Sequence, residues 1–414
     1  PRLKDPVVLL SKKVAELISD NKSSVISNLS KITKKQLIDL GVLSSSRTSE
    51  APFLKNEKTV SLWLHITNQC NLRCKYCYLH KSNENMSYEI AKKSIDFIFD
   101  KAKDNQSISV DIKISGGEPL TRFDFVEKIV TYTSKCSARF GINFSITVFT
   151  NSTLVTQELA EKLKKLNIGV TTSLDGIGKY HDTNRIYQNG SGSFQETIRG
   201  INILKSNSIP TNITVTITDS NISNLPSLVK YLVKNNLQFS LNFFRENPFS
   251  ENSNACKPDI LIKQMSKVYN FLFKNPPLWI DTDSLLDRVK INHPRLYTCQ
   301  AAHNYFAIKP NGDVSGCQMT LDFPCKHNLI SIGKSKNNNF QYKNMEYNPP
   351  YNKKVICKDC HWGSICCGGC PILSSNIFGS PFHPSPYCSV YKKLIPKLIT
   401  IEGKRLYKLM LNQG

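Results

Sequence analysis

The chain has 414 residues, of which 40% are hydrophobic, and its formal net charge is +22. This length allows one large domain beside a smaller one, and the hydrophobic content is ordinary for a globular protein. No run of about eighteen apolar residues occurs, so we expect no membrane span. The lysines are scattered, without a long basic run or interleaved aromatic residues. This distribution argues against a nucleic-acid surface, whereas an acidic peptide substrate fits the same charge.

Fourteen cysteines are the most unusual feature of the composition. In a secreted protein they would indicate disulfides, but the N-terminus, Pro1 to Pro6, has no apolar signal core. Cysteines separated by two residues favour metal ligation in a chain of this length. We therefore expect a reducing, cytoplasmic environment. The chain begins with Pro1 rather than Met, which is compatible with a fragment of a longer protein.

Residues 1–58 are polar and rich in helix-forming residues. An apolar periodicity over 9–18 predicts an amphipathic helix, and residues 32–41 predict a short helix that Thr33 caps and Gly41 ends. The stretch 44–58 has the composition of a linker. We therefore expect residues 1–58 to form an N-terminal helical segment and linker.

Residues 59–275 alternate between strand-like and helix-like stretches. Val, Ile, Thr and Phe are enriched in six predicted strands, at 60–66, 108–114, 143–149, 168–174, 211–217 and 237–243. Helical patterns lie between them at 87–103, 122–139, 156–166, 194–206 and 223–235. Repeated β-α units predict a parallel sheet with right-handed crossovers and a site at the carboxyl ends of the strands.

A loop with three cysteines, Cys70, Cys74 and Cys77, follows the first predicted strand. Thiolates are soft ligands that suit iron–sulfur clusters, and a tight loop can direct three of them at one cubane cluster. Three cysteines leave one iron without a protein ligand, which favours chemistry at the cluster over electron storage alone. A zinc site is the alternative, although zinc sites usually use paired C-x2-C elements.

The C-x3-C-x2-C spacing of this loop, with an aromatic residue before the last cysteine, resembles the signature of radical S-adenosylmethionine (SAM) enzymes. The resemblance implies a partial (β/α)6 TIM-like barrel in which Cys70, Cys74 and Cys77 hold a catalytic [4Fe–4S] cluster. It also implies that the open iron binds SAM, and that one electron from the cluster cleaves SAM to a 5′-deoxyadenosyl radical.

The second predicted strand ends in Gly116-Gly117-Glu118-Pro119. Glycines let the backbone approach a ligand closely, and the Glu118 carboxylate can accept a hydrogen bond from an ammonium group. Without further context, two glycines after a strand indicate only a turn. The four residues resemble the GGEP motif of the family, which implies that they bind the amino end of SAM.

Three further residues match the SAM pocket of the family. By the resemblance, Ser173 at the end of the fourth strand and Arg185 contact the ribose and the carboxylate of SAM. An arginine suits a carboxylate because its rigid fork donates two parallel hydrogen bonds. Tyr76 is expected to lie against the adenine. The alternatives are a helix cap for Ser173, a surface charge for Arg185 and simple shielding of the cluster for Tyr76.

Cysteine density rises beyond residue 276, and seven of the cysteines there form a pattern: Cys299, Cys317, Cys357, Cys360, Cys366, Cys370 and Cys388. These spacings resemble the SPASM extension, an auxiliary-cluster domain of peptide-modifying radical SAM enzymes. The resemblance implies that Cys357, Cys360, Cys366 and Cys388 hold one [4Fe–4S] cluster, and that Cys299, Cys317 and Cys370 hold another. We therefore expect a radical SAM core at 59–275 and a SPASM domain with a C-terminal helix at 276–414. A pair of zinc sites is the alternative.

The cluster on Cys299, Cys317 and Cys370 lacks a fourth ligand. Cys325 is the nearest candidate in the sequence, and without it the open iron would be available to substrate. Between Cys299 and Cys317, residues 311–313 predict the tight turn of a β-hairpin. Cys367, next to Cys366, is expected to point away from its cluster.

We therefore predict a radical SAM/SPASM maturase that abstracts hydrogen from a ribosomally made precursor peptide and installs a crosslink or another modification. Three [4Fe–4S] clusters and SAM are the expected cofactors, and flavodoxin or ferredoxin is the expected electron donor. Residues 32–41 also resemble the segment before the barrel in peptide-modifying members. One alternative is an anaerobic sulfatase-maturating enzyme, which usually begins closer to its cysteine loop. The other is a non-catalytic iron–sulfur or nucleic-acid-binding scaffold, which would need neither the GGEP motif nor the pair Ser173 and Arg185.

Overall fold

The computed structural model describes residue 30 and residues 58–250, 254–322 and 348–412. The helices expected within residues 1–58 and the candidate ligand Cys325 lie outside these ranges. None of the helices in the described part of the chain is long and apolar enough to cross a membrane.

Six parallel strands form the centre of the fold, and they neighbour one another in chain order. They are β1 Thr59–His65, β2 Ser109–Ser115, β3 Asn143–Thr150, β4 Gly169–Ser173, β5 Thr211–Ile217 and β6 Gln238–Phe243. Each coincides with a predicted strand to within one residue at either end. The predicted α/β class with a parallel sheet of the TIM-like type is confirmed.

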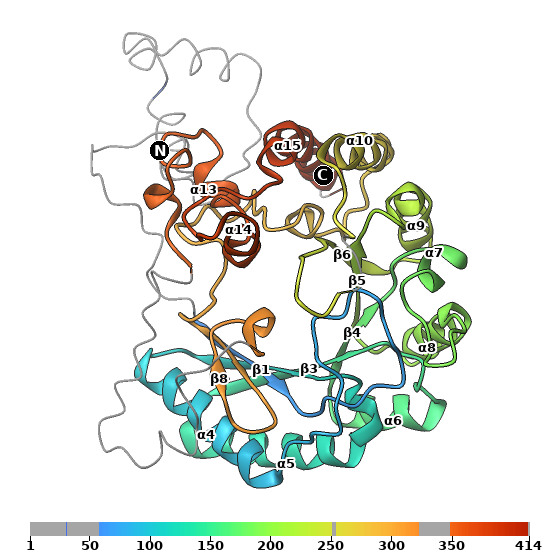
Figure 1. Cartoon of the computed structure of the whole chain (residues 1–414), viewed down its shortest axis with the longest axis vertical. Coiled ribbons are helices and arrows are strands. Elements are labelled where there is room, and N and C mark those ends of the chain that lie inside the picture. The colour runs from blue at the N-terminus through green and yellow to red at the C-terminus, as the bar shows by residue number, and fades with distance from the viewer. Residues whose placement is uncertain (1–29, 31–57, 251–253, 323–347, 413–414) are drawn as a thin grey trace.

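Helices cover the outer face of the curved sheet, as Figure 1 shows. The longer ones are α4 Tyr88–Asp104, α5 Phe123–Phe140, α6 Gln157–Lys165, α8 Phe194–Ser206, α9 Leu225–Lys234 and α10 Pro258–Lys274. Ser87 and Thr156 cap α4 and α6 by accepting hydrogen bonds from backbone N–H groups of the first turn. Gly141 ends α5 in the left-handed conformation, which glycine adopts at little cost. Short helical turns complete this half: η1 Pro119–Arg122, α7 Lys179–Asp182 and η2 Ile222–Asn224.

A short hairpin extends the sheet beyond β1. Strand β7, Tyr305–Ile308, pairs with β1 in parallel, and β8, Val314–Ser315, pairs with β7 in antiparallel. The predicted turn is confirmed, because Gly312 has a φ of 88° and the Asn311 side chain accepts a hydrogen bond from the Asp313 amide. Its attachment to the barrel sheet was not predicted. It covers an edge of β1 that would otherwise leave backbone donors and acceptors unpaired.

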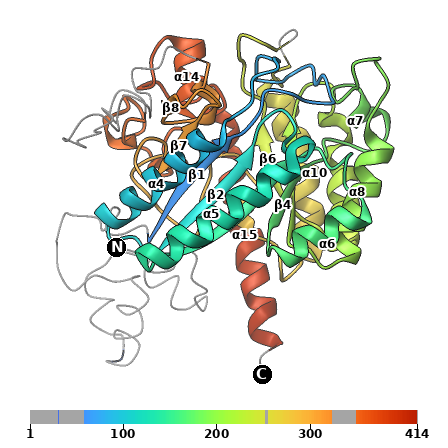
Figure 2. The same cartoon turned by 90° about the horizontal axis from the view of Figure 1, so that it is seen from below.

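The remaining chain packs over the inner face and the end of the sheet (Figures 1 and 2). It contains η3 Thr282–Ser284, η4 Gln318–Thr320, η5 Tyr351–Lys353, α13 Gly363–Cys366, α14 Pro371–Phe378 and α15 Cys388–Leu411. Helix α15 lies against α10.

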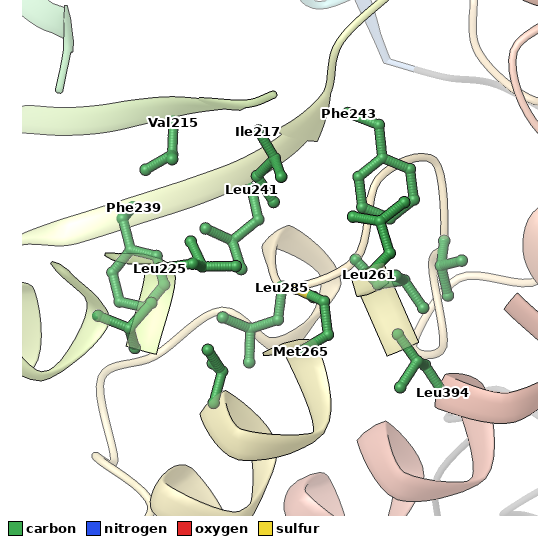
Figure 3. Packing of buried hydrophobic residues seen from close by; sticks show 14 of the residues in the cluster. Val215, Ile217, Leu225, Phe239, Leu241, Phe243, Leu261, Met265, Leu285 and Leu394 are labelled. Atoms are coloured by element: carbon green, nitrogen blue, oxygen red, sulfur yellow. The ribbon is translucent and has the colours of Figure 1, made fainter. Parts of the chain in front are cut away.

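One buried cluster joins the two halves of the chain. Figure 3 shows Leu394 of α15 close to Leu261 and Met265 of α10, below Leu241 and Phe243 of β6. The cluster also includes Cys366 and Cys370. The domain boundary expected at 275/276 therefore separates two stretches that share a hydrophobic core.

Candidate active site

A cavity of about 330 Å³ lies at the carboxyl ends of the strands. Strands β2, β3, β4 and β6 contribute their end residues Ser115, Thr150, Ser173 and Phe243 to its wall. Eight of the residues that the sequence singled out also line it: Cys70, Cys74, Tyr76, Cys77, Gly116, Gly117, Ser173 and Arg185. The fold thus brings residues that are about 115 positions apart in the sequence, such as Cys70 and Arg185, to the wall of one cavity.

The cysteine loop is fastened on two sides. Within the loop, the Arg73 guanidinium donates to the carbonyl oxygens of Cys70 at 2.6 Å and Leu72 at 3.0 Å. Asn71 donates to the Thr153 hydroxyl beyond β3, at 2.8 Å. The backbone amide of Arg73 bonds to the Ile186 carbonyl at 2.7 Å. These contacts fix a loop that has no regular secondary structure of its own.

The three loop cysteines are half-buried in the wall of the cavity. Burial raises the pKa of Cys70, and it raises the pKa of Cys74 to about 12. A cation offsets the charge that these thiols acquire on deprotonation, because Lys81 interacts with all three of them and forms a hydrogen bond with Cys77. Arg185 adds a second cation, with its Nη1 3.8 Å from the Cys74 sulfur. Because metal ligation displaces the thiol protons, such cations favour the ligated form.

The two glycines after β2 allow the chain to lie directly on the cysteine loop. A Cβ atom on Gly116 would come within 2.5 Å of the Thr67 carbonyl oxygen, and one on Gly117 within 2.0 Å of the Gln69 oxygen. Backbone hydrogen bonds close this contact, from Gly117 to Thr67 at 2.7 Å. Any other residue at either position would push the strand end away from the loop.

Glu118 lies behind the cavity wall. The side chain is fully buried and is not among the lining residues. Its carboxylate accepts hydrogen bonds from the Leu120 amide at 3.0 Å, the Thr150 hydroxyl at 2.8 Å and the Asn151 amide at 2.8 Å. This placement differs from the expectation of direct contact with an ammonium group. Glu118 instead ties the end of β2 to the end of β3, and the buried Pro119 begins the helical turn that follows.

Arg185 and Tyr76 share one buried carboxylate. Asp175, two residues beyond β4, accepts from Arg185 Nε at 2.6 Å, from the Tyr76 hydroxyl, and from the Thr216 amide at 2.8 Å. The guanidinium lies over the Tyr76 ring, 5.3 Å from its centroid. Burial alone would lower the pKa of Arg185, but Asp175 raises it above its ordinary value. Arg185 is therefore a cation held in a fixed position at the cavity, and Tyr76 is a fixed aromatic part of the cavity wall.

A second cysteine group surrounds a small cavity next to α15. Cys357, Cys360, Cys366 and Cys388 all line it, which are the four cysteines expected to act together. Lys354 is buried beside them, and its Nζ donates to the Cys367 carbonyl at 2.9 Å. The Cys367 thiol lies 3.2 Å from the Arg295 carbonyl, and Cys367 does not line the cavity, in accord with the expected orientation.

The third cysteine group adjoins the large cavity. Burial, followed by the neighbouring thiols of Cys299 and Cys370, raises the pKa of Cys317 to about 12. Burial would also raise the pKa of Cys370, but Arg245 and Arg288 lower it overall. Both arginines line the large cavity, so they lie between its interior and this cysteine group. Cys325 lies outside the described residues.

No group of three His, Cys, Asp or Glu side chains in the described ranges forms a site for a single metal ion. The cysteines are instead distributed around cavities, each with a buried or half-buried cation beside it. Of these cations, the sequence analysis identified only Arg185; it missed the others and Asp175. Only Lys81, four residues after Cys77, could have been suspected from its position; Lys354, Arg245 and Arg288 have no signal in the sequence.

Comparison with known proteins agrees with this geometry. The profile of the Radical SAM superfamily matches residues 64–232. An uncharacterised protein of Methanocaldococcus jannaschii is 38% identical over 276 residues, which cover 66% of this chain and 90% of that protein. A cysteine-type anaerobic sulfatase-maturating enzyme of Clostridium novyi is 24% identical, and the match covers 81% of this chain and 93% of that enzyme. The radical SAM cyclopropyl synthase TigE of Paramaledivibacter caminithermalis is 26% identical, and the match covers 84% of this chain and 75% of that enzyme.

Two solved structures have the same fold. The structure of anSMEcpe with bound AdoMet and a peptide superimposes with a TM-score of 0.68, at 21% identity, over 83% of this chain and 98% of the other. The structure of Streptococcus suis SuiB bound to its precursor peptide SuiA gives 0.54, at 18% identity, over 92% and 93%. Taken with the three-cysteine loop at the end of β1, these matches show that the chain belongs to the radical SAM superfamily of enzymes, which use a [4Fe–4S] cluster and SAM.

Proposed function

We propose that this enzyme is a radical SAM/SPASM maturase that modifies a peptide. The observation that carries the proposal is the large cavity, because the three loop cysteines, the GGEP glycines, Ser173 and Arg185 all face it. Cys70, Cys74 and Cys77 would hold the cluster, and Gly116, Gly117, Ser173 and Arg185 would hold SAM. Together the cluster and SAM would supply radical chemistry, the abstraction of hydrogen from carbon by a 5′-deoxyadenosyl radical.

The protein side chains position the reactants and exclude water. Asp175 holds Arg185 and Tyr76 in fixed orientations, so neither needs to reorganise when a carboxylate or an adenine arrives. Trp63 and Phe149, with ring centroids 4.6 Å apart, form part of an apolar wall that continues to Phe243 and Phe244. A dry wall protects a radical from side reactions with solvent.

The auxiliary cysteines would hold two further clusters. We assign one to Cys357, Cys360, Cys366 and Cys388, which line one cavity, and the other to Cys299, Cys317 and Cys370. Cys325 remains the candidate for the missing fourth ligand of the second. In this scheme residues 59–275 form the radical SAM core, residues 276–414 form the SPASM region, and residues 1–58 precede both. A flavodoxin or ferredoxin would supply the electron.

A peptide is the substrate that fits these features. The SuiB structure contains its precursor peptide and the anSMEcpe structure contains a peptide, and both proteins share this fold. The positive charge of the chain, +22, and the cations in the cavity favour an acidic peptide. Sulfatase maturation is the second candidate, since the Clostridium novyi enzyme matches over 93% of its length. A non-catalytic scaffold is set aside because the superfamily consists of enzymes.

The test begins with the protein reconstituted anaerobically with iron and sulfide, reduced with dithionite and supplied with SAM. We expect 5′-deoxyadenosine, and none from a variant with Cys70, Cys74 and Cys77 all replaced by Ala. A variant that still formed the product would refute the mechanism. Peptides encoded by short reading frames beside the gene are then compared with a sulfatase-derived peptide. A mass change in the peptides encoded beside the gene, without formylglycine in the sulfatase-derived peptide, would favour the peptide maturase.

A further inference from the structure

The large cavity is lined by cations without acidic partners on its surface. Four positively charged side chains line it, and they are Lys81, Arg185, Arg245 and Arg288. No Asp or Glu occurs among the described residues of its wall. A cavity of this kind attracts an anion, and its walls exclude the water that would screen the attraction.

Three of the four cations already form side-chain hydrogen bonds. Lys81 interacts with the thiols of the cysteine loop, and Arg185 is bound to Asp175. The Arg245 guanidinium holds both oxygens of Asp287, at 2.7 and 2.9 Å. These three side chains therefore have local functions in fixing the site.

Arg288 differs from the other three. Its guanidinium forms no hydrogen bond with any described residue, and its buried Nε has no hydrogen-bond partner among them. The nearest carboxylate, Asp287, lies 3.8 Å from Nε, but both of its oxygens are already engaged by Arg245. The side chain is 30% exposed, and it reaches the surface of the cavity. The thiols of Cys299 and Cys370 interact with Arg288 electrostatically, but its guanidinium forms no hydrogen bond with the described residues and lies at the surface of the cavity.

The backbone at Arg288 indicates that this orientation is built in. Its φ of 58° lies in the left-handed region, which is unfavourable for a residue with a side chain. A hydrogen bond stabilises this backbone conformation, because the Arg295 guanidinium donates to the Arg288 carbonyl at 2.7 Å. Residues held in such conformations occur often at ligand sites.

We propose that Arg288 binds a carboxylate of the peptide substrate, either an Asp or Glu side chain or the C-terminal carboxylate. The proposal rests on the proposed peptide-modifying function and names the chemical class that this end of the cavity selects. A guanidinium fork matches a carboxylate with two parallel charge-assisted hydrogen bonds, and desolvation strengthens the pair. Because Arg288 lies beside Cys299 and Cys370, the bound residue would be held between the SAM site and this cysteine group.

The test uses the reconstituted protein with SAM and synthetic pentapeptide pools. Each pool is acetylated, amidated and randomised, except for a central Asp, Glu, Asn, Gln or Cys. One more pool has a neutral centre and a free C-terminal carboxylate. Peptides retained on ultrafiltration are quantified by mass spectrometry, for the wild type, Arg288→Gln, Arg288→Lys and the control Arg139→Gln. Arg139 is an exposed arginine of α5 that is paired with Asp96 and does not line the cavity.

We expect the wild type and Arg139→Gln to enrich carboxylate pools over the matching amide pools about tenfold. The central-acid and free-terminus arms identify which carboxylate is bound. Arg288→Gln should lose the enrichment, and Arg288→Lys should keep part of it. Iron content and thermal stability, measured in parallel, show that each variant is folded and loaded.

The proposal would be overturned by a wild type without preference for carboxylates, by a preference that persists in Arg288→Gln, or by a wild-type preference for the Cys pool over the Asp and Glu pools. A variant that loses SAM affinity or cluster iron while keeping the carboxylate preference would assign Arg288 to the cofactors instead, and so would also overturn it. Failure of the proposed function is distinct, because it would appear as an absence of 5′-deoxyadenosine in the wild type.

Discussion

Two buried carboxylates shape the candidate active site without facing it. Asp175 orients Arg185 and Tyr76, and Glu118 joins the ends of β2 and β3. Each accepts three hydrogen bonds, which offset the cost of burying a charge. Motif residues can therefore act on a ligand indirectly, by holding the backbone that lines the cavity.

Replacing Glu118 with Ala should act mainly by lowering the free energy of unfolding, and not by removing a direct contact with SAM. The change leaves the Leu120 amide, the Thr150 hydroxyl and the Asn151 amide without their acceptor, and unsatisfied buried donors cost about 1–3 kcal/mol each. We expect a loss of at least about 2 kcal/mol in anaerobic urea unfolding. Ser173→Ala, at the cavity wall, is the contrast: its SAM affinity should fall while its unfolding midpoint stays near that of the wild type. Equal stability of Glu118→Ala and the wild type would refute this role for Glu118.

His181 gives the folded enzyme a sensitivity to acid. Burial lowers the pKa of His181 from 6.5 to about 4. Its Nδ1 accepts from the Asp175 amide at 3.3 Å, so the neutral ring donates through Nε2 to the Ser193 hydroxyl. Between pH 6.5 and 4 the unfolded chain binds a proton that the folded chain does not. The contribution of this group to stability is therefore complete above pH 6.5 and decreases by about 3 kcal/mol as the pH falls to 4.

We expect His181→Gln to have a weaker pH dependence of stability than the wild type between pH 6.5 and 4. The measurement is urea unfolding at a series of pH values. His383→Gln, at an exposed position, serves as the control and should follow the wild-type profile. Parallel profiles for the wild type and His181→Gln would contradict the assignment.

At the scale of elements, the sequence predicted the parallel strands well. Their composition and their spacing by amphipathic helices reflect local preferences and a repeated burial pattern, and both can be read from a single chain. The cysteine loop and the glycines were found because their spacings are conspicuous. By contrast, Asp175, Lys354 and Arg288 are isolated charges whose roles depend on which distant segments the fold brings near them.

The pairing of β7 with β1 is a further long-range feature that the sequence did not reveal. The predicted hairpin turn depends on local residues, Asn311 and Gly312, whereas the attachment depends on a free strand edge about 240 residues away, at Ser61, which pairs with Tyr305. This attachment has a consequence for cofactor binding, because β7 and β8 lie between Cys299 and Cys317.

Phe306→Ala should therefore loosen both the hairpin and the third cysteine group. Phe306 is buried, pairs in register with Leu62, and meets the Phe97 ring at 5.4 Å. Its truncation should cost about 3–5 kcal/mol. We expect reduced iron content after reconstitution, with the loop cluster still able to cleave SAM. The exposed Phe382→Ala is the control. Full iron content together with wild-type stability would contradict this prediction.

At the scale of the whole molecule, the three cysteine groups share one structure. The first belongs to the loop after β1, the third flanks the hairpin beside β1, and the second lies at the start of α15, which shares a hydrophobic core with α10. Cations accompany each group. Lys81 and Arg185 lie beside the first group, Lys354 beside the second, and Arg245 and Arg288 beside the third. Clusters held by several thiolates are anionic, so the same electrostatic requirement is met three times.

This repetition leads to a prediction about total iron. The reconstituted enzyme should contain about twelve irons, four from each of three cubane clusters. Three triple variants, each with Ala in place of the cysteines of one group, should each lose about four irons: Cys70, Cys74 and Cys77; Cys299, Cys317 and Cys370; Cys357, Cys360 and Cys366. The double variant Cys136→Ala/Cys256→Ala is the matched control, because both thiols are buried, belong to none of the three groups and should contribute no iron. Only the first triple variant should lose SAM cleavage as a direct consequence, since its cluster alone adjoins the SAM residues. A wild type with about eight irons, unaffected by one of the triple substitutions, would show that the corresponding cysteine group does not hold a cluster.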